Sequence, residues 1–173
     1  MFPSNVSPAL PDGQQADVNI QVGDVDVSAT NPVPVVDVWT VALVVDEAAD
    51  DSDKIVTVTA GQLWQILSIR VELVTTAAAG NRQIEIQVRD TADDIVLNIV
   101  PGTTQAASLT YVYSFAPAFP DLTAVRDTNY VMTPMHPTCL LPAGYDLRIW
   151  DNNAVAAAAD DMDIQIMYAW KAV

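Results

Sequence analysis

Alternation between apolar and polar side chains is the clearest pattern in this sequence. From Leu63 to Leu73 the residues alternate between two faces along the whole segment, and helical spacing fits it poorly. A period of two over this length predicts a half-buried β-strand. The expected faces consist of Leu63, Gln65, Leu67, Ile69, Val71 and Leu73 on one side, and of Trp64, Ile66, Ser68, Arg70 and Glu72 on the other.

A second alternating segment runs from Arg82 to Arg89. The connection before it ends in Gly80-Asn81, two residue types that tolerate positive φ in turns. The sequence therefore predicts that 63–73 and 82–89 form an antiparallel pair. In the second strand, Ile84, Ile86 and Val88 are expected to point inward, and Gln83, Glu85, Gln87 and Arg89 outward.

Similar short segments continue along the chain, separated by turn signals such as Pro101-Gly102 and Pro142-Ala143-Gly144. The alanine-rich run 153–161 is expected to form at most two helical turns or a loop. About eight strands without an amphipathic helix predict an all-β chain. The further predicted strands are 35–45, 55–59, 94–100, 108–115, 145–150 and 162–170. One face of 108–115 is expected to carry Leu109, Tyr111, Tyr113 and Phe115, and one face of 162–170 Met162, Ile164, Ile166, Tyr168 and Trp170.

Many short strands separated by turns are typical of a sandwich or a barrel. One connection, 116–138, interrupts the pattern and contains four of the eleven prolines. Connections longer than about 12 to 15 residues tend to be functional or to cross between sheets, as in jelly rolls. We therefore expect residues 35–173 to form a jelly-roll-like antiparallel β sandwich.

Residues 1–34 differ in composition and predict an extended N-terminal arm. Residues 1–53 contain ten acidic side chains and five prolines but no Lys or Arg. Such a segment, lacking a core of its own, is expected to add a strand to the sheet edge of a partner. An ordinary edge strand of its own domain is the alternative. The expected partner-binding residues are Val18, Ile20, Val22, Val25, Val27, Val33 and Val35.

The formal net charge of −15 narrows the range of partners. Binding to nucleic acids or anionic membranes depends on Lys and Arg, so neither is expected. An acidic surface suits a concentrated, self-repelling particle protein, and it equally suits a saline habitat. The start of the chain shows no secretion signal, and the longest apolar runs fall short of the ~20 residues of a membrane span. A soluble protein made in a cytoplasm is expected.

Residues with catalytic or ligand chemistry are sparse. His136 and Cys139 are the only histidine and cysteine, too few for a zinc site, and no phosphate-binding or dinucleotide-binding motif is present. We expect no catalytic residues, no cofactor and no metal, so the protein is not expected to be an enzyme. The acidic groups Asp46, Glu47, Asp50, Asp51 and Asp53, and Asp160, Asp161 and Asp163, are interpreted as solvated turn charges rather than calcium ligands.

Three phrases together resemble small virion proteins of tailed bacteriophages. They are TAGQLWQILSIRVEL followed by GNRQIEIQV, the long stretch Ser114–Asp151 with its LPAGY strand entry, and the ending ADDMDIQIMYAW. The resemblance implies a jelly-roll head decoration (cement) protein without enzymatic activity, which binds the major capsid protein lattice. It also implies a homotrimer on the capsid surface of the virion, made in the host cytoplasm.

Two other functions stay open. One is a different virion part, such as a head-fibre base or a tail-associated β module. The other is a carbohydrate-binding jelly-roll module for host attachment, which would use Trp39, Trp64, Trp150 or Trp170 if they lined one concave face.

Overall fold

The computed structural model describes residues 21–22, 25–26, 38–48, 53–118, 129–153, 155–156 and 158–173. It divides the chain into two units, Met1–Asp37 and Val38–Val173. Strands are the only regular elements of the described residues, which contain no helix. In the first unit, β1 (Gln21–Val22) pairs antiparallel with β2 (Val25–Asp26). The rest of the predicted arm lies outside the described residues, so the arm stays a prediction.

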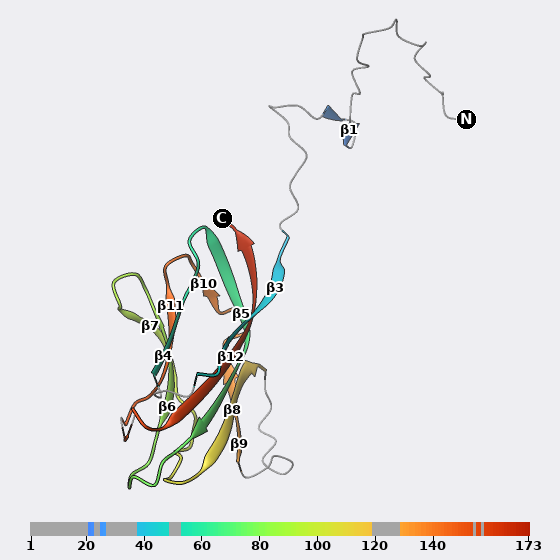
Figure 1. Ribbon diagram of the computed structural model, residues 1–173. Helices are drawn as coiled ribbons and strands as arrows, with labels where there is room; N and C mark the ends of the chain where they lie inside the picture. Colours follow the sequence, from blue (N-terminus) through green and yellow to red (C-terminus); the bar gives the residue numbers. More distant parts are fainter. Residues whose placement is uncertain are drawn as a thin grey trace, which may run out of the picture. The chain divides into compact units, whose positions relative to one another are not determined.

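The second unit consists of two β-sheets (Figure 1). All neighbouring strands are antiparallel except β8 and β9, which run parallel. The larger sheet has the order β3 (Thr40–Asp46), β12 (Asp161–Ala172), β5 (Gln62–Val74), β8 (Thr110–Pro117) and β9 (Tyr130–Met135), and β10 (Leu140–Leu141) also pairs with β5. The smaller sheet has the order β4 (Asp53–Thr57), β11 (Asp146–Asp151), β6 (Ile84–Arg89) and β7 (Ile95–Ile99).

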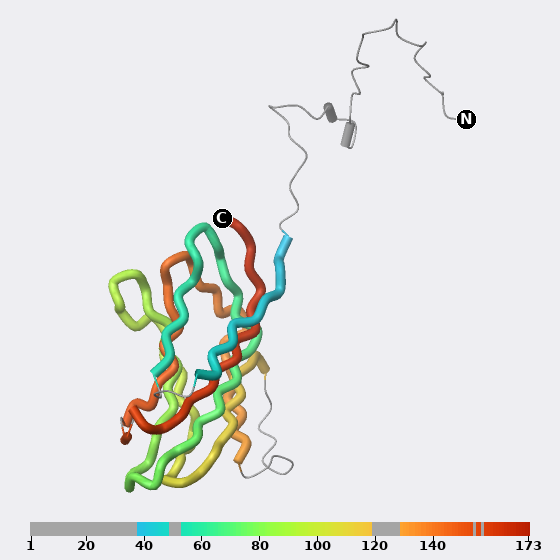
Figure 2. Tube along the Cα trace, in the orientation of Figure 1, coloured from blue at the N-terminus to red at the C-terminus, as the bar shows by residue number. Residues whose placement is uncertain are grey.

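The two sheets enclose one apolar core, and the chain crosses repeatedly between them (Figure 2). Burying one such aliphatic side chain contributes about 1.5–3 kcal/mol relative to leaving it in water, so this core is the main source of stability. An all-β sandwich is therefore confirmed. Fully buried apolar side chains come from both layers: Ile66, Val71, Leu73, Tyr113, Phe115, Ile164 and Ile166 from the larger sheet, and Ile84, Ile86 and Ile149 from the smaller one.

All eight predicted strands are present, with ends shifted by a few residues, and residues 35–37 of the predicted strand 35–45 lie outside the described residues. The predicted antiparallel pair of 63–73 and 82–89 is wrong. β5 lies in the larger sheet between β12 and β8, whereas β6 lies in the smaller sheet between β11 and β7. Gly80 does adopt a positive φ of 133°, but the connection that contains it carries the chain from one layer to the other instead of closing a hairpin.

The two predicted faces of β5 hold within each half of the strand but are not continuous along its whole length. A β-bulge leaves Leu67 without a partner in β12, where Met167 pairs with Ser68 and Tyr168 with Ile66. An extra residue shifts the alternation by one position. Trp64 and Ile66 are therefore buried before the bulge, and Ile69, Val71 and Leu73 after it.

The predicted connection 116–138 contains a strand that the sequence pattern did not reveal. β9 forms the edge of the larger sheet and includes Pro134, which cannot donate a backbone hydrogen bond. An edge strand tolerates this proline because one of its sides needs no partner. The sequence predicted an antiparallel sandwich, and the parallel pairing of β9 with β8 departs from that by making the larger sheet mixed.

Candidate interaction surfaces

Five of the seven predicted partner-binding residues lie outside the described part of the chain. Val22 and Val25 are cross-strand neighbours in the short pair of β1 and β2. The other five, Val18, Ile20, Val27, Val33 and Val35, lie outside the described residues. Their role as partner-binding residues stays a prediction.

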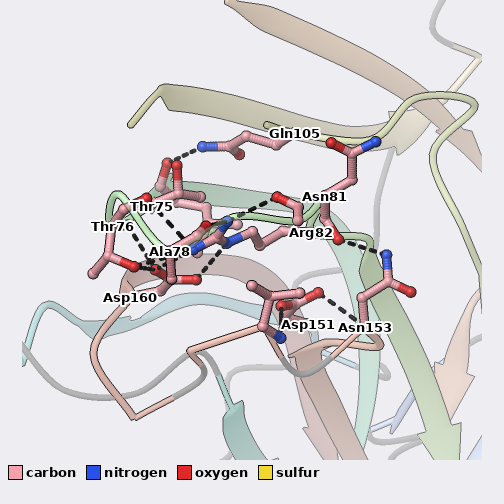
Figure 3. Close-up of polar contacts among 12 residues, drawn as sticks. Thr75, Thr76, Ala78, Asn81, Arg82, Gln105, Asp151, Asn153 and Asp160 are labelled. Atoms are coloured by element: carbon pink, nitrogen blue, oxygen red, sulfur yellow. Dashed lines mark hydrogen bonds and ion pairs between the residues drawn. The ribbon is translucent and has the colours of Figure 1, made fainter. Parts of the chain in front are cut away.

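A buried ion pair holds the loops at one end of the sandwich (Figure 3). Arg82 and Asp160 are both fully buried. The Arg82 Nε and Nη2 atoms donate to the two carboxylate oxygens of Asp160 at 2.7 and 3.0 Å. The pair joins the β5–β6 connection to the β11–β12 connection. Each of these connections carries the chain from one sheet to the other, so the ion pair fixes the two connections to each other.

The remaining polar groups around this pair are also satisfied. Arg82 Nη1 donates to the carbonyl oxygens of Ala78 and Gly80 at 2.7 and 2.9 Å, and Nη2 donates to the Thr76 hydroxyl at 3.1 Å. Asp160 Oδ1 accepts the Thr76 backbone N–H and hydroxyl at 2.7 and 2.8 Å. Burial alone would raise the pKa of Asp160, but hydrogen bonds from Arg82 and then Thr76 outweigh it and lower that pKa.

Two further side chains extend the network to neighbouring loops. Gln105 exchanges backbone hydrogen bonds with Arg82 at 2.7 and 2.9 Å, and its buried side chain accepts a hydrogen bond from the Tyr113 hydroxyl. Asp151 accepts the backbone N–H groups of Gln83 and Asn153. Three connections are thus cross-linked through the buried side chains of Arg82, Gln105, Asp151 and Asp160. Such a satisfied polar network favours a rigid platform over a set of independent loops.

The outer face of the smaller sheet is covered by charged and aromatic side chains. Arg89 forms a two-pronged ion pair with Asp146 at 2.8 and 2.9 Å. Glu85 and Gln87, predicted to point outward, are buried, and Gln87 Nε2 donates to Glu85 at 2.7 Å. Alternation correctly assigned both residues to the outer face, but it does not show how densely neighbouring side chains cover that face.

The four tryptophans do not gather on one face. Trp64 stacks on Tyr168 in the core, with ring centroids 3.9 Å apart, and Trp170 packs partly against the same core. Trp39 is 37% exposed beneath Lys171. The Trp150 ring lies on the outer face of the smaller sheet. The Arg148 guanidinium lies 3.8 Å from that ring's centroid, so the ring face that would stack on a sugar is already covered.

The outer face of the larger sheet has an apolar margin along β3. Val41, Leu43 and Val45 alternate with partly buried residues and are 62%, 58% and 47% exposed. Met167 of β12 pairs with Leu43 and is 42% exposed. Sequence reasoning missed this surface, because the alternation of a strand does not show which of its faces the second sheet covers.

The candidate chemical residues are not assembled into a reactive site. His136 lies in an exposed turn, where its Nδ1 faces the Thr138 backbone N–H at 3.2 Å. Cys139 is buried, and burial raises the pKa of its thiol, which disfavours the thiolate. Among the described residues, no group of three or more His, Cys, Asp or Glu is placed to hold a metal ion. Asp50 and Asp51 lie outside them.

Basic side chains in the described residues are occupied by partners within the protein. Lys54, Arg70, Arg82, Arg89 and Arg148 each form an ion pair with a carboxylate. The remaining one, Lys171, lies over Trp39. This part of the chain therefore offers no cluster of uncompensated positive charge.

No helix in the described ranges is both long and apolar enough to cross a membrane. Comparison with known proteins found no matching family model and no match among curated proteins.

Proposed function

We propose that the sandwich is a jelly roll. The support is its strand order. β3-β12-β5-β8 faces β4-β11-β6-β7, and all pairs within these two sets are antiparallel. Two four-stranded sheets built from two interlocked Greek keys have this arrangement. In this interpretation β9 and β10 are an insertion between β8 and β11.

We further propose that the protein is a non-enzymatic structural component of a tailed-bacteriophage particle. It decorates and stabilises the capsid by binding the major capsid protein lattice. The observation that carries the proposal is this jelly-roll strand order, because the phage-like phrases coincide with β5, β6, β11 and β12 of that core. The cross-linked loop end around Arg82 and Asp160 adds a rigid platform suited to attachment.

The proposed partners follow from the same resemblance and from charge. The protein binds the major capsid protein through the arm residues Val18–Val35 and forms a homotrimer on the capsid surface of the virion. It binds neither nucleic acid nor membrane, which is supported by a net charge of −15 and by the paired state of the described basic side chains.

Copy number in purified particles tests this function most directly. Quantitative mass spectrometry is expected to find hundreds of copies, as a lattice-wide decoration requires. A dozen or fewer would refute decoration and indicate a vertex or tail component instead. Absence from particles, together with binding on a glycan array that is lost on replacing Trp39, would favour the carbohydrate-binding alternative.

Attachment through the arm has its own test. Deleting residues 1–34 should abolish binding to undecorated particles while circular dichroism still reports a folded β core. Raising the salt concentration severalfold should weaken binding of the full chain only modestly, because screening acts on exposed charge pairs and not on buried apolar contacts. A truncated chain that still decorates particles fully would move the attachment surface to the sandwich.

A further inference from the structure

Within the described residues, β3 is the least protected of the edge strands of the two sheets. Natural proteins protect exposed edges with charges, prolines, bulges or short strands. β4 carries Asp53 and Lys54, β9 carries Pro134, and the five-residue β7 pairs with β6 through a register shift. By contrast, β3 carries its single charge, Asp46, at its last position. The preceding residues Thr40–Val45 contain neither a charge nor a proline, and the pairing of β3 with β12 is regular.

β3 is also unpartnered on its outer side within the described residues. Its single neighbour in the larger sheet is β12, as Figure 1 shows at the side of the sandwich. The row Val41, Leu43 and Val45 remains about half exposed on the outer face, and Met167 extends it onto β12. A strand edge with free backbone groups and an apolar face is suited to receive another strand.

We propose that β3 pairs antiparallel with β3 of a second copy, across a two-fold axis at Leu43. The apolar pattern of β3 is symmetric about this residue, so the two-fold register sets Val41 opposite the partner's Val45 and Leu43 opposite the partner's Leu43. The row from Met167 to Leu43 then continues into the same row of the second copy. Cross-strand apolar pairs of this kind are the main side-chain stabilisation of a sheet.

Charge selects this antiparallel arrangement over a parallel one. Each copy carries a net charge of −15, and the acidic residues Asp46 and Glu47 follow directly after Val45. The two-fold register sets Asp46 opposite the partner's Thr40. The two Asp46 carboxylates are then about six residues, or roughly 20 Å, apart along the strands, beyond the ~10 Å screening length at 0.1 M salt. A parallel pairing would align like charges about 5 Å apart.

The contact is isologous and therefore distinct from the contacts of a trimer. It does not depend on capsid binding, so it can be tested on the isolated full-length protein whatever the result of the particle experiments. A single strand pair is a small interface, so we expect weak, concentration-dependent association. On a particle, high local concentration would let such contacts join neighbouring copies.

A cysteine at the two-fold axis tests the register. Leu43→Cys is expected to form an intermolecular disulfide under mild oxidation, since opposing Cα atoms in a sheet lie within disulfide range. Val45→Cys alone should not, because two copies of residue 45 are about 14 Å apart in this register. Mixing Val41→Cys with Val45→Cys should restore the cross-link. The native Cys139 is buried, and Ile95→Cys, on the edge strand of the other sheet with 56% exposure, controls for random collisions.

Equal cross-linking of Leu43→Cys and Ile95→Cys would overturn the proposal, as would the absence of any Leu43→Cys dimer. Sedimentation velocity supplies an independent measurement. Leu43→Lys places two cations opposite each other and should weaken two-fold association by at least about tenfold. Ile95→Lys should leave it unchanged. Two further outcomes would refute the proposal. One is association that persists in Leu43→Lys, and the other is a full-length protein that forms no two-fold dimer at high concentration.

Discussion

Replacing Asp160 with Asn is expected to remove a large part of the stability of this protein. The two carboxylate oxygens of Asp160 accept four hydrogen bonds, two from Arg82 and two from Thr76. An amide of the same shape offers one accepting oxygen, and its NH₂ group would face the donors of Arg82. The substitution therefore leaves a buried guanidinium without its counter-charge in a site with no exposed surface.

The expected loss is about 3–5 kcal/mol in the free energy of unfolding, the usual cost of removing one partner from a buried ion pair. Domains of ordinary stability have about 5–15 kcal/mol in total. With a urea m-value of about 2 kcal/mol/M, the unfolding midpoint should fall by roughly 1.5–2.5 M. Tryptophan fluorescence and circular dichroism during urea unfolding measure this shift.

Glu72→Gln is the matched control, because it removes a carboxylate from the partly exposed pair with Arg70. That change should alter stability by no more than about 1 kcal/mol. The double variant Arg82→Met with Asp160→Asn should lose less than the sum of the two single losses, because neither group is then left charged without its partner. If Asp160→Asn costs no more than Glu72→Gln, the buried pair is not the determinant that we infer.

Three smaller predictions concern charge and backbone conformation. The lowered pKa of Asp160 gives stability that is present above the unfolded-state value of ~3.9 and is lost as pH falls through the folded-state value, so acid titration should destabilise the wild type more than Asp160→Asn. Asp163→Asn should stabilise the protein slightly at pH 7, by up to about 1 kcal/mol in thermal melts, because burial and then Asp161 and nearby carboxylates raise the pKa of Asp163 and so disfavour its charged form. Gly80→Ala should destabilise by more than about 1 kcal/mol, since its φ is 133° and a Cβ would lie 3.0 Å from the Val155 side chain, while Gly102→Ala, in open space, should cost less.

The positions of strands were predictable because a period of two is local information. Ile84, Ile86 and Val88 pointed inward as expected, and all are buried. Sheet membership depends on contacts between distant segments, so the assignment of β5 and β6 to one hairpin failed. The bulge at Leu67 likewise depends on how β5 pairs with β12, which the sequence of β5 alone does not encode.

The candidate surfaces were less predictable than the strands. The sequence pattern assigned Arg82 to neither face, and the residue is fully buried. The partner that makes its burial tolerable lies 78 positions later in the chain. The acidic group of Asp160, Asp161 and Asp163 suggested solvated turn charges, and Asp160 proved to be that partner. The exposed apolar row on β3 was not predicted, because apolar residues in an alternating pattern are normally expected to be buried.

The pairing of β3 with β12 has a consequence for how the protein is made. Trp170 of β12 pairs with Thr40 of β3. β3 comes early in the second unit, and it cannot pair until β12, the last strand, has been synthesised. At about 5–20 residues per second, the ribosome needs roughly 6 to 26 s to synthesise the intervening 130 residues. During that interval β3 lacks the strand that it pairs with in the described structure, and its apolar residues are exposed to solvent. The nascent chain is thus exposed to aggregation through β3 until synthesis ends, and a chaperone that shields residues 40–46 should raise the yield of folded protein.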